Sequence, residues 1–224
     1  MTEAILMSGE NVENYLKNIY KLQAKSGRVA TSALALRLGI SDASVSDMVK
    51  KLSEQGMVRH VPYKGVVLTE KGRRLALKIV RRHRLWELFL VQMLNYPWDK
   101  IDAEAERLEH LTSDDLERKL DESLGFPQID PHGDPIPTEN GEITESNFVS
   151  LADLDSSQSA VIARVSDSSP EILQYVTELG LALEKKVLVK KKMEFDGSLL
   201  IKIGTKEHFV SRKLAASIFV RPRR

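Results

Sequence analysis

The sequence contains no cysteine. Disulfides and thiolate metal ligands are therefore excluded, and any metal ion must be held by nitrogen and oxygen ligands. The sequence also has no run of about 18 apolar residues, so no segment is expected to span a membrane. Residues 1–7 are too short for a secretory signal peptide and lack its basic start. We therefore expect a cytoplasmic protein that has no membrane partner.

The net charge of +1 conceals an uneven distribution of charge along the 224 residues. Residues 1–78 carry 13 Lys and Arg against 7 Asp and Glu, a net charge of +6. Residues 79–150 have a net charge of −9, and residues 151–224 have a net charge of +4. A basic N-terminal third suits a polyanionic partner and an acidic middle suits cations, although either asymmetry can also be a solvated surface.

The first 78 residues have the order of elements of a winged helix-turn-helix. Apolar residues at helical spacing predict helices over about 10–25, 31–38 and 42–55. Gly39-Ile40-Ser41 provides the short, glycine-containing turn that the motif needs between its second and third helices. Two extended runs, MVRHVPY and GVVLTE, follow and predict a small hairpin. We therefore expect a DNA-binding domain over residues 1–78.

Short polar side chains line the front of the third predicted helix. Ser44 and Ser46 point away from the apolar stripe that contains Val45, and small side chains let a helix enter the major groove closely. Basic residues on the flanks and the wing can contact phosphates. The residues that we expect to contact DNA are Arg28, Ser41, Ala43, Ser44, Ser46, Lys50, Tyr63 and Lys64. The alternative is that the serines only cap the helix, and Asp47 would repel a phosphate.

The acidic middle of the chain is predicted to be helical and then irregular. Helical periodicity runs from Thr69-Glu70 to about Leu94, where Pro97-Trp98 follows. A further helix is expected from Asp99 to Leu124, with a candidate break at Thr112-Ser113. The Pro-, Gly- and Asp-rich stretch over about 125–150 is typical of a loop or a linker. We expect a helical domain over residues 79–146.

Two groups of potential metal ligands lie on these predicted helices. His83 and Glu87 are four residues apart within an apolar stripe, where a carboxylate needs a cationic partner or a metal ion. The next helix carries four ligand-type residues on one arc of about 100°. These four residues are Asp102, Glu106, Glu109 and His110.

Each group alone has an ordinary explanation: a satisfied His–Glu pair in a core for the first, and an acidic helix surface for the second. Together, behind a winged helix, they favour a metal site with nitrogen and oxygen ligands. Such a set suits Mn2+ or Fe2+ and does not exclude Zn2+. The remaining histidines, His60, His132 and His208, lack such neighbours in the sequence and are interpreted as loop, wing or strand residues.

From about residue 151 the apolar pattern changes to a period of two. Four or five runs of strand length occur, and Asp196-Gly197 marks a tight hairpin between two of them. Pro170 opens a short helical stretch, EILQYVTEL. Residues 151–224 are expected to form a small β-barrel of the SH3 type. The chain as a whole is thus predicted to be mainly α, with a C-terminal β domain.

The sequence resembles the diphtheria-toxin-repressor and manganese-transport-regulator family along essentially its whole length. The segments that carry the resemblance are NYLKNIYKL at 14–22, SDASVSDMVKKLSEQGMV at 41–58, YKGVVLTEKGRRLA at 63–76, RRHRLWE at 81–87, AERLEHLTSDDLERKL at 105–120 and DPHGDPIP at 130–137. The resemblance implies a winged helix, a helical dimerisation and metal-binding domain and, as in the longer members, a C-terminal SH3-like domain. It also implies a homodimer in which bound metal favours the conformation that binds a palindromic operator and represses metal-uptake genes.

The resemblance further implies that the ligands divide between two sites. His83, Glu87 and Asp102 look like the site that the family completes with a Glu and a Gln from its SH3-like domain. Glu171 and Gln174 are three residues apart, as that motif requires, and are the candidates here.

Glu106, Glu109 and His110 look like the second, regulatory site, which the family closes with a ligand on the first helix. That position is Asn14 here, where family members have Met or Asp, and an Asn oxygen ligates more weakly than a carboxylate. Lys17 stands where manganese members carry a further Glu, which argues against their binuclear geometry.

Two differences from the iron-type members of the family affect which metal ion the site prefers. Asp102 replaces a His of those members, and Glu106 replaces their Cys. A harder ligand set favours Mn2+ over Fe2+, and Zn2+ or Co2+ can substitute in vitro.

The sequence thus predicts a metal-dependent transcriptional repressor that is not an enzyme, binds double-stranded DNA as a homodimer and needs no organic cofactor. Two other interpretations are an iron-dependent repressor of the same family and a winged-helix regulator that does not sense metal. A metal-dependent hydrolase would need an open coordination position and a base beside bound water, and the sequence has no further catalytic motif.

Overall fold

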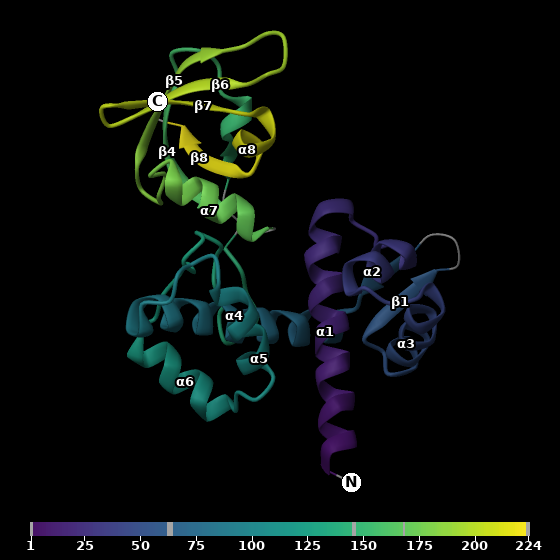
Figure 1. The fold of residues 1–224 in the computed structure, drawn as a ribbon. Coiled ribbons are helices and arrows are strands. Elements are labelled where there is room, and N and C mark those ends of the chain that lie inside the picture. Colours follow the sequence, from purple (N-terminus) through teal and green to yellow (C-terminus); the bar gives the residue numbers. More distant parts are fainter. Residues whose placement is uncertain (1, 62–64, 145–146, 168, 223–224) are drawn as a thin grey trace. The chain divides into compact units, whose positions relative to one another are not determined.

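The computed structural model in Figure 1 describes most of the chain. The residues it describes are 2–61, 65–144, 147–167 and 169–222. No helix within these ranges is long and apolar enough to cross a bilayer. The chain divides into two compact units, and the boundary between them falls within three helices. These helices are α4 (Glu70–Leu94), α5 (Ile101–Glu109) and α6 (Asp114–Ser123).

The first unit extends to His83 and includes Glu106–Glu117 and Pro137–Ile143. Its N-terminal elements have the predicted order of three helices followed by a hairpin (Figure 1). They are α1 (Thr2–Ser26), α2 (Thr31–Leu38), α3 (Asp42–Glu54), β1 (Val58–Val61) and β2 (Gly65–Leu68). The strands pair antiparallel, with Val58 opposite Leu68. Helix α1 begins earlier than predicted, since its first residues include Ala, Leu and Met, which favour helix.

The turn between α2 and α3 has the geometry that its sequence predicts. Gly39 adopts φ 67°, a left-handed conformation that glycine tolerates without strain. The Ser41 hydroxyl accepts a hydrogen bond from the Ser44 amide at 3.2 Å and so caps α3. The fully buried Leu16, Leu34 and Leu52 come from the three helices and form one core with β1 and β2.

A buried ion network holds α4 against α6 within the first unit. Glu117 is 5% exposed and accepts hydrogen bonds from Arg81 Nε at 3.0 Å and from Arg82 Nε at 2.8 Å. Arg81 also donates to the Pro137 carbonyl at 2.7 Å. Because a buried charge is costly unless it is paired, these contacts fix the orientation of α6. The predicted break before α6 is present, and Ser113 caps the new helix by accepting from the Leu116 amide.

The second unit comprises Arg84–Ala105, Arg118–Ile136 and the chain from Thr144 onward. Its sheet is antiparallel and six-stranded, with the order β3-β8-β4-β5-β6-β7. Its strands and helices are β3 (Val149–Ser150), β4 (Ser159–Val165), α7 (Pro170–Glu178), β5 (Lys186–Lys192), β6 (Leu199–Ile203), β7 (Lys206–Val210), α8 (Arg212–Ala216) and β8 (Ile218–Pro222), with a 3-10 turn over Leu151–Asp153. Alternate strand residues, among them Val187, Val189 and Ile201, fill a core that α7 covers with Leu173 and Val176.

The segment predicted as a linker is ordered where it meets the β domain. The Asp130 carboxylate accepts hydrogen bonds from the amides of His132 and Asp134, and the His132 carbonyl accepts from the Val165 amide of β4. Gly133 has φ 90°, and a Cβ there would lie 2.1 Å from the Ala163 carbonyl oxygen. Only glycine permits this close approach. The repeated Pro, Gly and Asp residues therefore build a tight turn instead of a flexible connection.

Candidate metal centre

Helix α5 brings Glu106, Glu109 and His110 together. Their spacing of three and four residues puts them on one face of the helix. One ligand atom of each side chain lies within 4.8 Å of the other two. Two carboxylates and an imidazole are hard to intermediate donors, which suit Mn2+, Fe2+ or Zn2+. The geometry and chemistry of this set therefore fit a divalent cation.

Helix α1 supplies the opposite side of the same site. The His110 imidazole lies 2.7 Å through Nδ1 from Glu13 Oε2, and 3.0 Å through Nε2 from Asn14 Oδ1. The predicted first-helix residue, Asn14, is therefore next to a predicted ligand. Glu13 is a further candidate that the sequence reasoning missed, because nothing in the sequence distinguishes it from an exposed acidic residue.

His83 and Lys17 complete the surroundings of Glu109, which is fully buried. His83 Nδ1 is 2.6 Å from Glu109 Oε2 and 4.0 Å from Glu106 Oε2. Lys17 Nζ is 2.5 Å from Glu106 Oε2 and 2.5 Å from Glu109 Oε1. We name the group formed by Lys17, His83, Glu106, Glu109 and His110 the acidic cluster. It lies entirely within the first unit.

The other predicted ligands lie in the second unit. Asp102 is exposed and precedes Glu106 by one helical turn on α5. Glu171 and Gln174 lie on exposed positions of α7. Glu171 accepts a hydrogen bond from the Ser169 hydroxyl, which lowers the pKa of its carboxyl group. Gln174 Nε2 donates to Asp99 Oδ2 at 2.9 Å. Neither of these two contacts is with a predicted ligand.

Glu87 has a buried histidine as its neighbour. The Nε2 atom of His132 lies 3.6 Å from Glu87 Oε1, and the two side chains are 1% and 2% exposed. Neither ring nitrogen of His132 has a hydrogen-bond partner within 3.5 Å in the described residues. His132 does lie in a turn, as predicted, but the expectation that it lacks a ligand-type neighbour was wrong. The signal that could have found it is its place between Asp130 and Asp134 in DPHGD.

Charges around this second group shift its protonation equilibria. Burial, and after it the nearby Glu87 and Asp134 carboxylates, raise the pKa of Asp130 to about 7, against the opposing effect of Arg84. Burial by itself lowers the pKa of His132, but the Glu87, Asp130 and Asp167 carboxylates outweigh it and leave that pKa raised. The carboxylates around His132 therefore favour a positive charge at this position, either a proton on the imidazole or a bound cation.

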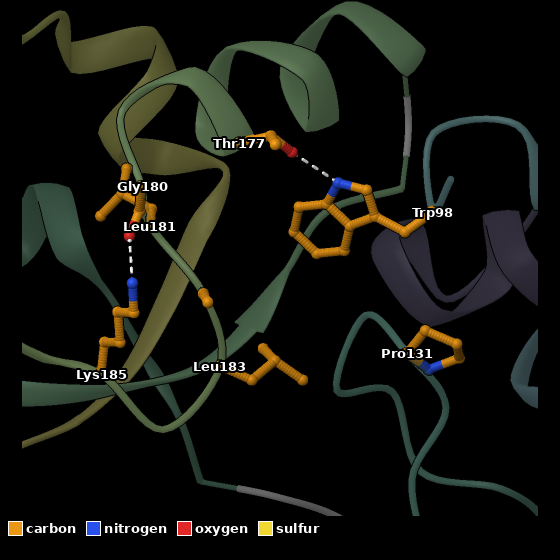
Figure 2. Close-up of a pocket in the computed structure, with 8 residues that line it drawn as sticks. Trp98, Pro131, Thr177, Gly180, Leu181, Leu183 and Lys185 are labelled. Carbon is orange, nitrogen blue, oxygen red and sulfur yellow. Dashed lines mark hydrogen bonds between the residues drawn. The ribbon is translucent and has the colours of Figure 1, made fainter. Parts of the chain in front are cut away.

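An apolar cavity adjoins His132 within the second unit. The Trp98 ring packs against His132 with the ring centroids 5.5 Å apart. Trp98 also lines a cavity of about 500 Å³, and its indole Nε1 donates to the Thr177 hydroxyl at 2.7 Å (Figure 2). The indole therefore ties α7 to the segment that precedes α5 and lines the cavity beside His132.

The residues predicted to contact DNA are mostly exposed on α3. Ser41, Ala43, Ser44, Ser46 and Lys50 are exposed, as is Arg28 before α2. The Ser46 hydroxyl donates to the Asp42 carbonyl at 2.9 Å, and the Ser41 and Ser44 hydroxyl groups are 2.9 Å apart. The serines thus have local partners, as the capping alternative requires. Tyr63 and Lys64 lie outside the described residues.

Arg59 is a basic wing residue that the sequence analysis did not select. With Arg28 it lines a cavity of about 160 Å³, whose floor is formed by β1 and β2 residues. Both guanidinium groups are on exposed residues, and arginine forms paired hydrogen bonds with phosphate. This face of the first unit is therefore suited to an anionic polymer.

Three family descriptions match successive parts of the chain. Residues 7–66 match the N-terminal DNA binding domain of the iron dependent repressors, residues 69–138 match their metal binding and dimerisation domain, and residues 149–222 match the FeoA domain. The chain is also similar to a solved manganese-dependent transcriptional repressor in complex with manganese, with 39% identity and a TM-score of 0.89 over 95% of this chain and 100% of that one. The chain therefore belongs to the iron-dependent repressor family of metal-dependent transcriptional regulators.

Two further relatives show the range of metals in the family. The structure of ScaR with bound Cd2+ is 30% identical, with a TM-score of 0.81 over 94% of this chain and 98% of that one. The iron-dependent repressor IdeR of Mycobacterium tuberculosis is 39% identical over 128 residues, which are 57% of this chain and 56% of that protein. This chain thus spans just over half the length of the curated relatives it matches.

Proposed function

We propose that the protein is a metal-activated transcriptional repressor that binds a palindromic operator as a homodimer and represses metal-uptake genes. The observation that carries the proposal is the grouping of Glu106, Glu109 and His110, together with the contacts of His110 with Glu13 and Asn14. In this proposal residues 1–78 bind DNA, and residues 79–146 form the dimer and bind metal. Residues 151–224 form an SH3-like domain. The three matched ranges support this division. The proposal includes no catalytic step and no organic cofactor.

The acidic cluster is proposed to take Mn2+ in preference to Fe2+. Its donors are carboxylate oxygens and imidazole nitrogens, to which Asn14 of α1 adds an amide oxygen, and none of them is sulfur. Hard oxygen donors suit Mn2+, and Zn2+ or Co2+ can also bind such a set in vitro. Iron-dependent repression by the same residues is the second candidate, supported by the similarity to IdeR.

A second cation site is proposed around Glu87 and His132, because the buried imidazole has no hydrogen-bond partner among the described residues. Asp130 and Asp167 add negative charge to this group. His132→Ala should then remove one Mn2+ ion per chain in titration calorimetry, and His60→Ala, on the exposed wing, should remove none. Equal stoichiometry in the two variants would exclude the site. Asp102 remains a proposed ligand from its helical spacing and the family resemblance, and Glu171 and Gln174 remain proposed ligands from the resemblance alone.

The mechanism follows from how α1 is held. When bound, a divalent cation supplies the positive charge that holds carboxylate, imidazole and amide donors together. Glu106 and Glu109 of α5, with His110 directly after it, would then hold Glu13 and Asn14 of α1. The same helix contributes Leu16 and Ile19 to the winged-helix core, so fixing α1 acts directly on the DNA-binding domain. Activation is a shift of population toward the arrangement that binds DNA.

The proposal is tested by DNA affinity at fixed salt and different metal concentrations. A duplex selected from a random pool by the Mn2+-loaded protein serves as the probe, titrated with Mn2+, Fe2+ and Zn2+. We expect metal to tighten binding of the wild type at least tenfold, about 1.4 kcal/mol, and to have little effect on Glu106→Ala. Glu104→Ala, on the same helix outside the ligand set, is the control. Metal-free protein that binds as tightly as loaded protein would favour a regulator that does not sense metal.

A further inference from the structure

Lys17 is a buried lysine whose charged end lies inside the acidic cluster. The residue is 2% exposed, and its neighbours Leu16 and Ile19 on α1 are fully buried. A buried ammonium group is stable only where opposite charges compensate the loss of hydration. Two carboxylates do so here, since Lys17 Nζ is 2.5 Å from both Glu106 Oε2 and Glu109 Oε1.

These two carboxylates are also two of the proposed metal ligands. The Lys17 ammonium contacts one oxygen of each, and His83 Nδ1 contacts the second oxygen of Glu109 at 2.6 Å. Both oxygens of Glu109 are therefore occupied by groups of this chain. A divalent cation bound to the same oxygens would lie close to the ammonium, and two like charges at such a distance repel strongly where little water screens them.

We propose that Lys17 is a tethered cation that competes with the metal for Glu106 and Glu109. In the metal-free protein its ammonium compensates part of the negative charge of these two carboxylates and keeps the site folded. Metal binding requires the ammonium to withdraw from at least one of them, and this requirement weakens the affinity and sets the metal concentration at which the protein responds. The inference rests on the proposed function, since it assumes that the acidic cluster is the metal centre.

The position of Lys17 also gives its withdrawal a structural consequence. Its carbon chain belongs to α1, and the adjacent Tyr15, Leu16 and Ile19 pack in the winged-helix core. A change in the contacts of Lys17 is therefore a change in the restraints on that helix. Replacement of the Lys17 ammonium by a metal ion would therefore change how α1 is held in the DNA-binding domain.

The test compares metal binding by the full-length wild type, Lys17→Met and Lys17→Gln. Methionine keeps most of the side-chain volume without charge, and glutamine keeps a hydrogen-bond donor. Lys21→Met removes the same charge one turn further along α1 and is the control. Mn2+ affinity is measured by titration calorimetry on metal-free protein, and the melting temperature is measured with and without Mn2+. A readout of DNA binding is not needed.

We expect both Lys17 variants to bind Mn2+ roughly tenfold more tightly or better, since tenfold needs only a small part of the energy of a buried ion pair. Their metal-free melting temperature should fall, and the rise on adding Mn2+ should exceed that of the wild type and of Lys21→Met. Unchanged or weaker Mn2+ affinity in both variants would overturn the proposal and leave Lys17 a structural residue. If Lys17→Met does not fold, Lys17→Gln decides the question by the same criterion.

Rejection of the Lys17 proposal can be distinguished from rejection of the proposed function. If Glu106→Ala binds Mn2+ as tightly as the wild type does, the acidic cluster is not the metal centre and both proposals fall. If Glu106→Ala loses binding but the Lys17 variants match the wild type, only the competition by Lys17 is rejected.

Discussion

The single residue Glu109 contributes to the stability of the fold as well as to the candidate metal centre. Its side chain is fully buried, one oxygen contacts His83, and the other contacts Lys17, with His110 Nε2 3.3 Å away. The carboxylate of Glu106 is also bound to Lys17 but is 41% exposed. The two ligands therefore have different energetic roles, although they lie three residues apart on one helix.

Alanine at these two positions should separate stability from metal binding. Glu109→Ala leaves the buried Lys17 ammonium with a single carboxylate partner and is expected to lower the free energy of unfolding of the metal-free protein by about 3–5 kcal/mol. Glu106→Ala removes a partly exposed partner and should cost about 1 kcal/mol. Urea denaturation with chelator present measures both values. Equal losses would show that the burial of Glu109 is not what makes it important.

A second single residue whose replacement tests the structure is Gly133. Gly133→Ala would place a Cβ against the Ala163 carbonyl and hold alanine at a positive φ, so we expect a loss of stability of roughly 3 kcal/mol or more. Gly125 also has a positive φ, of 73°, but a Cβ added there would meet no atom of the described residues within 4 Å. Gly125→Ala should therefore cost only about 1–2 kcal/mol. Similar denaturation midpoints for the two variants would contradict the close packing of this turn on β4.

At the scale of the elements, α4 is held to α6 by buried charge instead of by apolar contacts alone. Arg81 and Arg82 both pair with Glu117, and Arg82 Nη2 also lies 2.5 Å from Asp114. Each oxygen of the Glu117 carboxylate thus accepts a hydrogen bond from one guanidinium group. This network fixes α6 and, through the short connection before it, the end of α5 that carries Glu109 and His110.

Removal of that shared carboxylate should therefore be costly. We expect Glu117→Ala to lower the free energy of unfolding by about 3–5 kcal/mol, because two buried arginines lose the carboxylate that they share. Glu122→Ala on the same helix removes an exposed partner of Lys119 and should change it by less than about 1 kcal/mol. Thermal or chemical denaturation compares the two, and a mild effect of Glu117→Ala would mean that water reaches the arginines.

The sequence predicted the features that depend on the spacing of residues close together in the chain. Helix periodicity placed Glu106, Glu109 and His110 on one face, and Gly39 and Ser41 marked the turn before α3 correctly. Spacing alone could not give contacts between distant residues: Lys17 and Glu106 are 89 positions apart, and the pairing of Glu87 with His132 depends on how the turn at Gly133 folds. The position of Asn14 beside His110 was expected only from the family resemblance. The short α8 was also missed, because a helix of five residues carries too little periodicity.

At the scale of the whole molecule, helix α1 joins the two proposed binding events. The helices of the DNA-binding domain pack on α1, and α1 carries Glu13, Asn14 and Lys17 into the acidic cluster or beside it. If metal and DNA favour the same arrangement of α1, each must strengthen the binding of the other by the same factor. This reciprocity does not depend on which metal or which operator the protein uses in the cell.

The most direct test is therefore the Mn2+ affinity of the full-length protein with and without a saturating duplex selected from a random pool. We predict tighter Mn2+ binding on DNA, by the same factor by which Mn2+ tightens DNA binding, and loss of this coupling in Glu106→Ala. Mn2+ affinity that is the same with and without the duplex would contradict the coupling through α1.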